Sequence, residues 1–277
     1  MKWNIIADTA CDLYNKDINN ENINFETIPF SIRIGNEEII DDESLDVNSL
    51  IEKMDASKEP AKTSCPSTGD WYDRFSKDGN VIAITITSKL SGSYNSAIAA
   101  KNMILEDDPN KNIVVLDSKS TGAEIILIID RIVELINSGL EFDDVVKEIN
   151  EFMKKTKVVF ALSSFNNLVK NGRMSSTSAL IARILGFVGI GIARDGEIVM
   201  KTKARGKRHL IEKIIDDIKE RGFAAKKIII DHCQNLNLAQ MLEEIIKSIW
   251  SDVKVVIKST RGLCTIYAEK GGLIVGY

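Results

Sequence analysis

The chain has 277 residues, a formal net charge of −4 and 44% hydrophobic side chains, so it is long enough to bury one large domain or two ordinary ones. Its basic residues are scattered and only 6% of side chains are aromatic, which argues against nucleic-acid binding. No apolar run approaches the roughly 20 residues of a membrane span, and a strand-like stretch stands where a signal peptide would begin. We therefore expect a cytoplasmic protein.

The first predicted elements are short apolar runs separated by polar turns. Residues 3–7 predict a strand that ends at Asp8, and residues 28–34 and 38–40 predict a hairpin near a sheet edge. Residues 45–54 are expected to form a short helix. Asp8 is a candidate for a network residue beneath a ligand site, and it fits equally well as a helix cap or turn former.

A first cluster of hydroxyl groups follows, in the run Thr63-Ser64-Cys65-Pro66-Ser67. The residues before it are polar and show no apolar periodicity, which predicts a loop. Hydroxyl groups on such a loop contact a ligand or cap a helix, and Ser67 is well placed to cap a helix over residues 69–77. Capping leaves Thr63 and Ser64 unexplained, so these two are candidates for ligand binding.

A second hydroxyl cluster spans residues 85–93 and lies between two regular elements. Residues 81–86 predict a buried parallel strand, and a helix is expected from about Tyr94. In open α/β sheets the turn between such elements lies at the carboxyl edge, where helix N-terminal amides favour an anion. Ser91 and Ser93 are therefore expected at an anion-binding end of the sheet.

Strand and helix alternate again in the next segment. Residues 113–116 predict a strand, and residues 122–137 and 142–153 predict amphipathic helices. This alternation predicts an α/β fold whose mainly parallel sheet carries helices on both faces. We assign residues 1–157 to this N-terminal domain, which holds the hydroxyl loops.

The pattern changes after a strand at residues 158–162, and residues 158–277 are expected to form a second, mixed α+β domain. Residues 188–193 and 198–202 predict a hairpin, because Asp195-Gly196 suits a type I′ turn. The remaining predicted elements are helices over 207–221 and 239–250 and strands over 227–231, 253–258 and 271–277.

Three features of the second half have two interpretations each. The apolar segment Leu180–Val188 lines a chain-binding tunnel or is ordinary core. Arg173, after Asn171-Gly172, anchors an anion or is a surface charge on a turn. Arg205 stands in the basic run of residues 201–209, which would ordinarily be a solvated face.

Cysteine and histidine usage limits the available chemistry. The four cysteines form no C-x-x-C pair, which disfavours metal and redox sites and predicts reduced thiols. Of the two histidines, His209 and His232, the second could act as a base. A stand-alone serine hydrolase or esterase of small lipids is therefore the alternative function, although neither hydroxyl cluster contains a G-x-S-x-G elbow and the chain has no G-x-x-x-x-G-K-[ST] phosphate loop. We assign no catalytic residue.

Several short motifs, taken in order, carry a resemblance that covers essentially the whole chain. The chain resembles the DegV family of bacterial fatty acid-binding proteins. The motifs are Ile6-Ala7-Asp8-Thr9, Ile28-Pro29-Phe30, Thr63-Ser64-Cys65-Pro66-Ser67, Leu90-Ser91-Gly92-Ser93-Tyr94, Val115-Leu116-Asp117-Ser118, Asn171-Gly172-Arg173-Met174-Ser175 and Ala204-Arg205-Gly206-Lys207.

The resemblance implies a two-domain α/β fold with a fatty acid between the domains. It implies that the carboxylate is bonded to Thr63 and Ser91, and that the acyl chain lies in a tunnel to which the second domain contributes. The residues it assigns to fatty acid binding are Thr63, Ser64, Ser91, Gly92 and Tyr267, and those it assigns to a supporting network or to partner docking are Asp8, Arg173 and Arg205.

In some bacteria such proteins are the lipid-binding subunit of a fatty acid kinase and present the carboxylate to a separate ATP-binding partner. The resemblance therefore implies a non-catalytic carrier in phospholipid metabolism, with palmitate, stearate or oleate as ligand, no metal or other cofactor, and transient membrane contact. At two positions the chain departs from the family. Val188-Gly189 stands where Lys-Pro is usual, and Tyr267 aligns where a histidine is usual.

Overall fold

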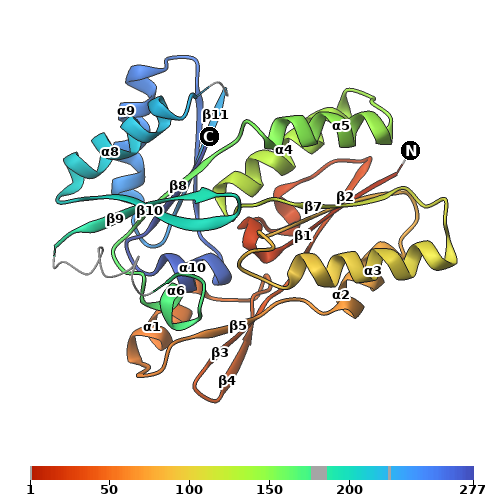
Figure 1. Cartoon of the computed structure of the whole chain (residues 1–277), viewed down its shortest axis with the longest axis horizontal. Coiled ribbons are helices and arrows are strands. Elements are labelled where there is room, and N and C mark those ends of the chain that lie inside the picture. The colour runs from red at the N-terminus through yellow and green to blue at the C-terminus, as the bar shows by residue number, and fades with distance from the viewer. Residues whose placement is uncertain (1, 176–185, 224–225) are drawn as a thin grey trace.

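The computed structural model describes residues 2–175, 186–223 and 226–277 (Figure 1). A four-stranded sheet, sheet A, has the order β2-β1-β6-β7 and is parallel throughout. Its strands are rich in buried β-branched residues, as expected for a sheet covered on both faces. Their bounds are Trp3–Asp8 for β1, Ile23–Ile28 for β2, Asn80–Thr85 for β6 and Ile113–Asp117 for β7.

Helices cover both faces of sheet A, which confirms the predicted α/β fold. Helices α2 (Thr68–Phe75) and α3 (Ser93–Asp107) pack on one face. Helices α4 (Ala123–Asn137) and α5 (Phe142–Met153) lie on the other side in Figure 1, where the ring of Phe142 stacks on that of Trp3. Ser67 caps α2 in a capping box with Asp70, as predicted.

A six-stranded mixed sheet, sheet C, is built from the second half of the chain. Its order is β10-β9-β8-β13-β11-β12, and only β11 and β12 pair in parallel. Asp195 and Gly196 have φ angles of 51° and 85°, which confirms the predicted turn between β9 and β10. The bounds are Val158–Leu162 (β8), Val188–Arg194 (β9), Glu197–Ala204 (β10), Lys227–His232 (β11), Lys254–Ser259 (β12) and Leu273–Gly276 (β13).

The two faces of sheet C belong to different cores. Helices α8 (Lys207–Glu220) and α9 (Leu236–Ile249) cover the outer face, where Val159 packs. The inner face carries Phe160 and joins the core that α4 shares with sheet A. Helix α4 packs directly on β11 and β13, although it precedes the predicted boundary at residues 157 and 158. That division into domains stays a prediction.

A small antiparallel sheet, sheet B, corrects one prediction. Its order is β4-β3-β5, from Glu37–Ile40, Ser31–Ile34 and Lys62–Ser64, and helix α1 (Val47–Ala56) follows β4. Thr63 and Ser64 therefore lie on a short strand and not on a loop. The strand exists because Thr63 pairs with Ile32, a long-range contact that local periodicity does not reveal. The hairpin predicted near a sheet edge consists of β3 and β4. Strand β4 is at the edge of sheet B, whereas β3 is its central strand.

Several short elements were not predicted at all. They are strand β2, the helices α6 (Asn166–Lys170) and α10 (Gly262–Ala268), and the 3₁₀ turns η1 (Thr9–Cys11) and η2 (Asn15–Asp17). Among the residues that the structure describes, no helix has the length and apolar character needed to cross a membrane.

Arg261 joins these pieces and is almost fully buried, with 1% of its surface exposed. Its guanidinium donates to the carbonyl oxygens of Leu13 and, at 3.0 Å, Asp41, and it lies 4.2 Å from the ring centre of Tyr14. The Asp41 carboxylate in turn accepts hydrogen bonds from the first amides of α10, including that of Gly262 at 3.0 Å. This one side chain therefore links η1, the segment after β4 and the start of α10.

We expect Arg261→Met to destabilise the fold by roughly 3–5 kcal/mol, because it leaves the Asp41 carboxylate buried without its cation. Arg208→Met is the matched control, since the Arg208 side chain is 94% exposed and its loss should change stability by about 0.5 kcal/mol or less. Urea unfolding of both variants measures the difference. Equal midpoints for the two would contradict the linking role of Arg261.

Candidate functional site

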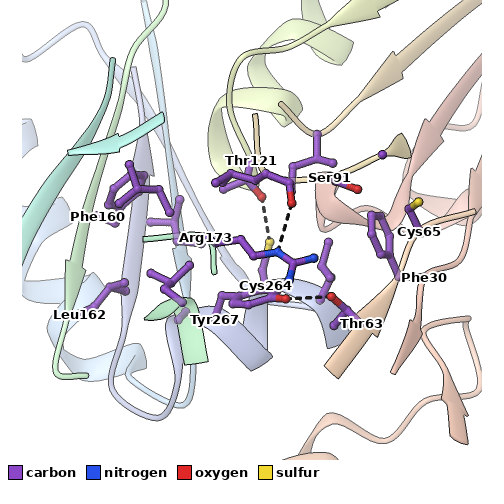
Figure 2. Close-up of a pocket in the computed structure, with 18 of the residues that line it drawn as sticks. Phe30, Thr63, Cys65, Ser91, Thr121, Phe160, Leu162, Arg173, Cys264 and Tyr267 are labelled. Carbon is purple, nitrogen blue, oxygen red and sulfur yellow. Dashed lines mark hydrogen bonds between the residues drawn. The ribbon is translucent and has the colours of Figure 1, made fainter. Parts of the chain in front are cut away.

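A cavity of about 360 Å³ lies where β5, the β6–α3 loop, β8, α6 and α10 meet (Figure 2). Its size falls within the range of about 300–1,000 Å³ typical of small-molecule sites. Most of its surface is apolar, and the apolar lining includes Phe30, Ile86, Phe160, Leu162, Leu168 and Leu263. Both halves of the chain therefore contribute to the wall.

All five residues predicted to bind the ligand line this cavity. Thr63 and Ser64 come from β5, Ser91 and Gly92 from the loop before α3, and Tyr267 from α10. The Thr63 Oγ1 and Tyr267 Oη atoms are hydrogen-bonded at 2.8 Å. Residues from three distant segments thus bring hydroxyl groups to one cavity.

The loop of Ser91 leads directly into the N-terminus of α3. Ser91 Oγ accepts a hydrogen bond from the Ser93 amide at 3.2 Å, and Gly92 precedes the first helical residue. A Cβ atom on Gly92 would lie 3.3 Å from Cys65 Sγ, so the glycine lets the two hydroxyl segments pack closely. The positive end of a helix dipole near these hydroxyls favours an anion.

Asp8 lies beneath this loop and is completely buried. Its carboxylate accepts from Ser93 Oγ at 2.6 Å and from the Ile86 amide at 3.0 Å. Burial raises the pKa of Asp8 to about 7, against the lowering effect of these hydrogen bonds. Asp8 does not line the cavity, and it ties the end of β1 to the loop that carries Ser91.

The two candidate arginines occupy different places. Arg173 lines the cavity, where its Nε donates to the Leu90 carbonyl oxygen at 3.2 Å and its side chain points toward Tyr267 (Figure 2). Arg205 is exposed after β10 and does not line the cavity. Its guanidinium lies 5.9 Å from the ring centre of Phe187. The structure therefore separates the two arginines that the resemblance grouped together.

The predicted tunnel segment falls partly outside the described residues. Positions 180–185 of Leu180–Val188 are among those not described, while Phe187 and Val188 are described and do not line the cavity. The apolar wall found instead includes Phe160 and Leu162, whose alternation along β8 marks one face of the strand. The sequence of β8 is apolar at every position, so it does not reveal which residues face which core.

Two polar residues of the wall were also missed. Thr121 and Cys264 both line the cavity and contact each other there, with Thr121 Oγ1 and Cys264 Sγ 3.5 Å apart (Figure 2). Burial raises the pKa of the Cys264 thiol well above its usual range, which keeps it protonated. No signal in the sequence pointed to this pair, because each residue belongs to an element whose place in the fold depends on tertiary contacts.

The arrangement suits an elongated ligand with an anionic head. Hydroxyl groups, a helix N-terminus and one guanidinium supply donors, and most of the remaining wall is apolar. Neither histidine of the chain lines the cavity. Over residues 2–175, 186–223 and 226–277, no group of three His, Cys, Asp or Glu side chains is arranged to hold a metal ion.

Solved structures similar to this one include ligand-bound proteins. The fatty acid kinase B3 protein of Streptococcus pneumoniae, loaded with linoleic acid, is 37% identical with a TM-score of 0.97, over 100% of this chain and 99% of that one. A DegV family protein from Eubacterium eligens, loaded with heptadecanoic acid, is 33% identical with a TM-score of 0.93, over 99% and 98% of the two chains.

Sequence comparison leads to the same family. A DegV domain-containing protein of Streptococcus pyogenes serotype M18 is 38% identical over 281 residues, which is 100% of this chain and 99% of the relative. The family model described as uncharacterised proteins of the DegV family matches residues 2–277. The similarity to these proteins extends to both the sequence and the fold. The chain therefore belongs to the DegV family.

Proposed function

We propose that the protein binds one long-chain fatty acid, with the carboxylate at the hydroxyl end of the cavity and the acyl chain along its apolar wall. The observation that carries the proposal is the meeting of Thr63, Ser91 and Tyr267 in one mostly apolar cavity. Similar structures loaded with linoleic and heptadecanoic acid support it. A saturated or monounsaturated acid such as palmitate, stearate or oleate has the required chemistry.

The head group and the acyl chain are expected to contribute differently to the binding free energy. Each hydrogen bond to a charged carboxylate contributes roughly 1.5–3 kcal/mol, and each buried methylene contributes about 0.8 kcal/mol. A long acyl chain therefore supplies most of the affinity, and the hydroxyl groups of Thr63 and Ser91 set the orientation. Arg173 is the cationic side chain among the lining residues and offsets the charge of the head group.

We further propose that the protein is a non-catalytic subunit that presents the carboxylate to a separate ATP-binding kinase. The similarity to the fatty acid kinase B3 protein supports this role. Docking requires an exposed surface of complementary charge, and Arg205 is exposed outside the cavity in a run with Lys203 and Lys207. Arg205 is therefore our candidate for partner docking, while Arg173 acts at the head group.

Replacing both Thr63 and Ser91 by Ala should raise the Kd for oleate at least about tenfold, because each lost bond to the carboxylate contributes roughly 1.5–3 kcal/mol. The melting temperature without lipid should change little. Displacement of a fluorescent fatty acid measures the Kd. The double variant Thr202→Ala with Ser248→Ala removes two hydroxyl groups outside the cavity and is the control. If both double variants bind oleate equally, the head group lies elsewhere.

Arg205→Ala should retain fatty acid but form less acyl phosphate with the cognate kinase subunit, because the docking charge is lost while the cavity is untouched. Arg208→Ala is the control, since Arg208 is exposed in the same basic run. A coupled assay at equal lipid occupancy compares the product formed. Equal rates for the wild type and both variants would remove Arg205 from partner docking and leave the lipid-binding proposal unaffected.

A further inference from the structure

Two buried carboxyl groups lie close together outside the cavity lining. They have no part in the proposed binding of a fatty acid. Asp12 follows η1, Asp231 lies near the end of β11, and both are completely buried. Their Oδ2 atoms lie 3.3 and 3.2 Å from the position that a Cβ atom would take on Gly122. Gly122 has a φ of 55° and no side chain, so the backbone leaves room for both groups.

The hydrogen-bond donors around this pair are too few. Asp12 Oδ1 accepts from the Arg261 amide at 2.7 Å. Within the described part of the chain, no donor satisfies Asp12 Oδ2 or either carboxyl oxygen of Asp231, and the thiol of Cys264 is only a weak donor to Asp12. Ionised carboxylates only accept hydrogen bonds, so two of them facing each other would leave buried oxygens unpaired at a large desolvation cost. One added proton turns an acceptor into a donor and removes most of that cost.

We propose that Asp12 and Asp231 form a proton-binding site, in which one carboxyl group carries a proton and donates it to the other, ionised group. The proton comes from solvent, no covalent bond between heavy atoms changes, and the pair keeps a single negative charge. The geometry that supports the pair is the approach of both Oδ2 atoms to the same position beside Gly122. The ligand of this site is the proton itself, and the proposal does not depend on lipid binding.

The remaining charge lies close to a helix N-terminus. Gly122 is the N-cap of the 15-residue helix α4, whose first amides favour a negative charge. Arg261 on the α10 side and Lys258 on β12 also favour ionisation, while Asp41 opposes it. One charge is therefore stabilised where two would not be.

Further groups around the pair are neutral or acidic. The thiols of Cys11 and Cys264 have raised pKa values because of burial, and burial lowers the pKa of His232, so these groups add no positive charge. Asp8 lies on the neighbouring strand β1 and is itself buried. From β13, Ile274 contributes only apolar contact beside Gly122. Among the described residues, only the Arg261 amide and the weakly donating Cys264 thiol hydrogen-bond to the pair.

The electrostatics agree with the geometry. Burial raises the pKa of Asp12 to about 7, and burial followed by the charge of Asp12 raises the pKa of Asp231 well above its usual range. Because both native pKa values exceed those of the unfolded chain, the native state binds the proton more tightly. The contribution of this proton binding to the free energy of unfolding is fully present at pH values below about 4. It is lost as the pH rises through the native pKa values.

Carbon-13 NMR of the unchanged protein tests the site directly. The carboxyl resonances of Asp12 and Asp231 should move together in a titration well above the ordinary aspartate value of about 3.9, with one proton on the pair at neutral pH. If both carbons resonate as ionised carboxylates at neutral pH, the proposal is wrong. This measurement requires no substitution and so does not depend on a variant that folds.

Asp231→Asn provides a second test, because its amide donates to Asp12 without any titratable proton. The melting temperature of Asp231→Asn minus that of the wild type should rise by about 2 °C or more from about pH 6 to about pH 9, because the variant lacks the Asp231 carboxyl group that loses a proton in the wild type.

The control is Asp217→Asn, which alters another buried aspartate that already has partners, with Lys201 at 2.8 Å and Arg221 at 3.1 Å. Its difference from the wild type should stay constant over the same pH range. An Asp231→Asn difference that is equally constant would overturn the proton-binding site.

Discussion

The contact between Arg261 and Asp41 is the constraint on which the site geometry depends. A buried guanidinium and a buried carboxylate are costly to desolvate, so surrounding groups must offset that cost. Here Asp41 accepts hydrogen bonds from the amides that begin α10. Arg261 donates a hydrogen bond to a carbonyl oxygen in the loop after β1. Helix α10 then carries Tyr267 to Thr63, so a charge pair outside the cavity determines where its hydroxyl groups meet.

The two hydroxyl segments reach one place by different routes. Ser91 follows a strand of a parallel sheet and arrives at the carboxyl edge, which is where such sheets usually bind ligands. Thr63 arrives through antiparallel pairing of β5 with β3, in a separate small sheet. The structure therefore combines a common α/β binding position with a strand that only the tertiary fold creates.

Predictions from sequence succeeded where the determinants were local. The Ser67 capping box and the Asp195-Gly196 turn depend on residues within a few positions of each other, and both are present. The alternation of strands and helices likewise predicted sheet A. These features follow from backbone geometry and hydrophobic period, which a single sequence records directly.

The failures have a common physical origin. Strand β5 is three residues long and depends on its partner strand, and α10 is a short helix stabilised by Asp41 from far along the chain. The family resemblance pointed to five residues that line the cavity, and their role in binding stays a prediction. Thr121, Cys264 and the buried pair of Asp12 and Asp231 carried no local signal. Contacts between distant segments are set by packing, which composition and periodicity do not encode.

The core shared by the two sheets restricts how the molecule can move. Ile82 of sheet A, Ile125 of α4 and Phe160 of sheet C belong to one continuous apolar layer. Separating the two halves by a hinge motion would expose that layer to water, at a free-energy cost of about 25 cal/mol per Å² of apolar surface. We therefore expect a ligand of the proposed kind to enter and leave without separation of the halves, so that its residence time would depend on local motions of the cavity wall and not on the stability of the fold as a whole.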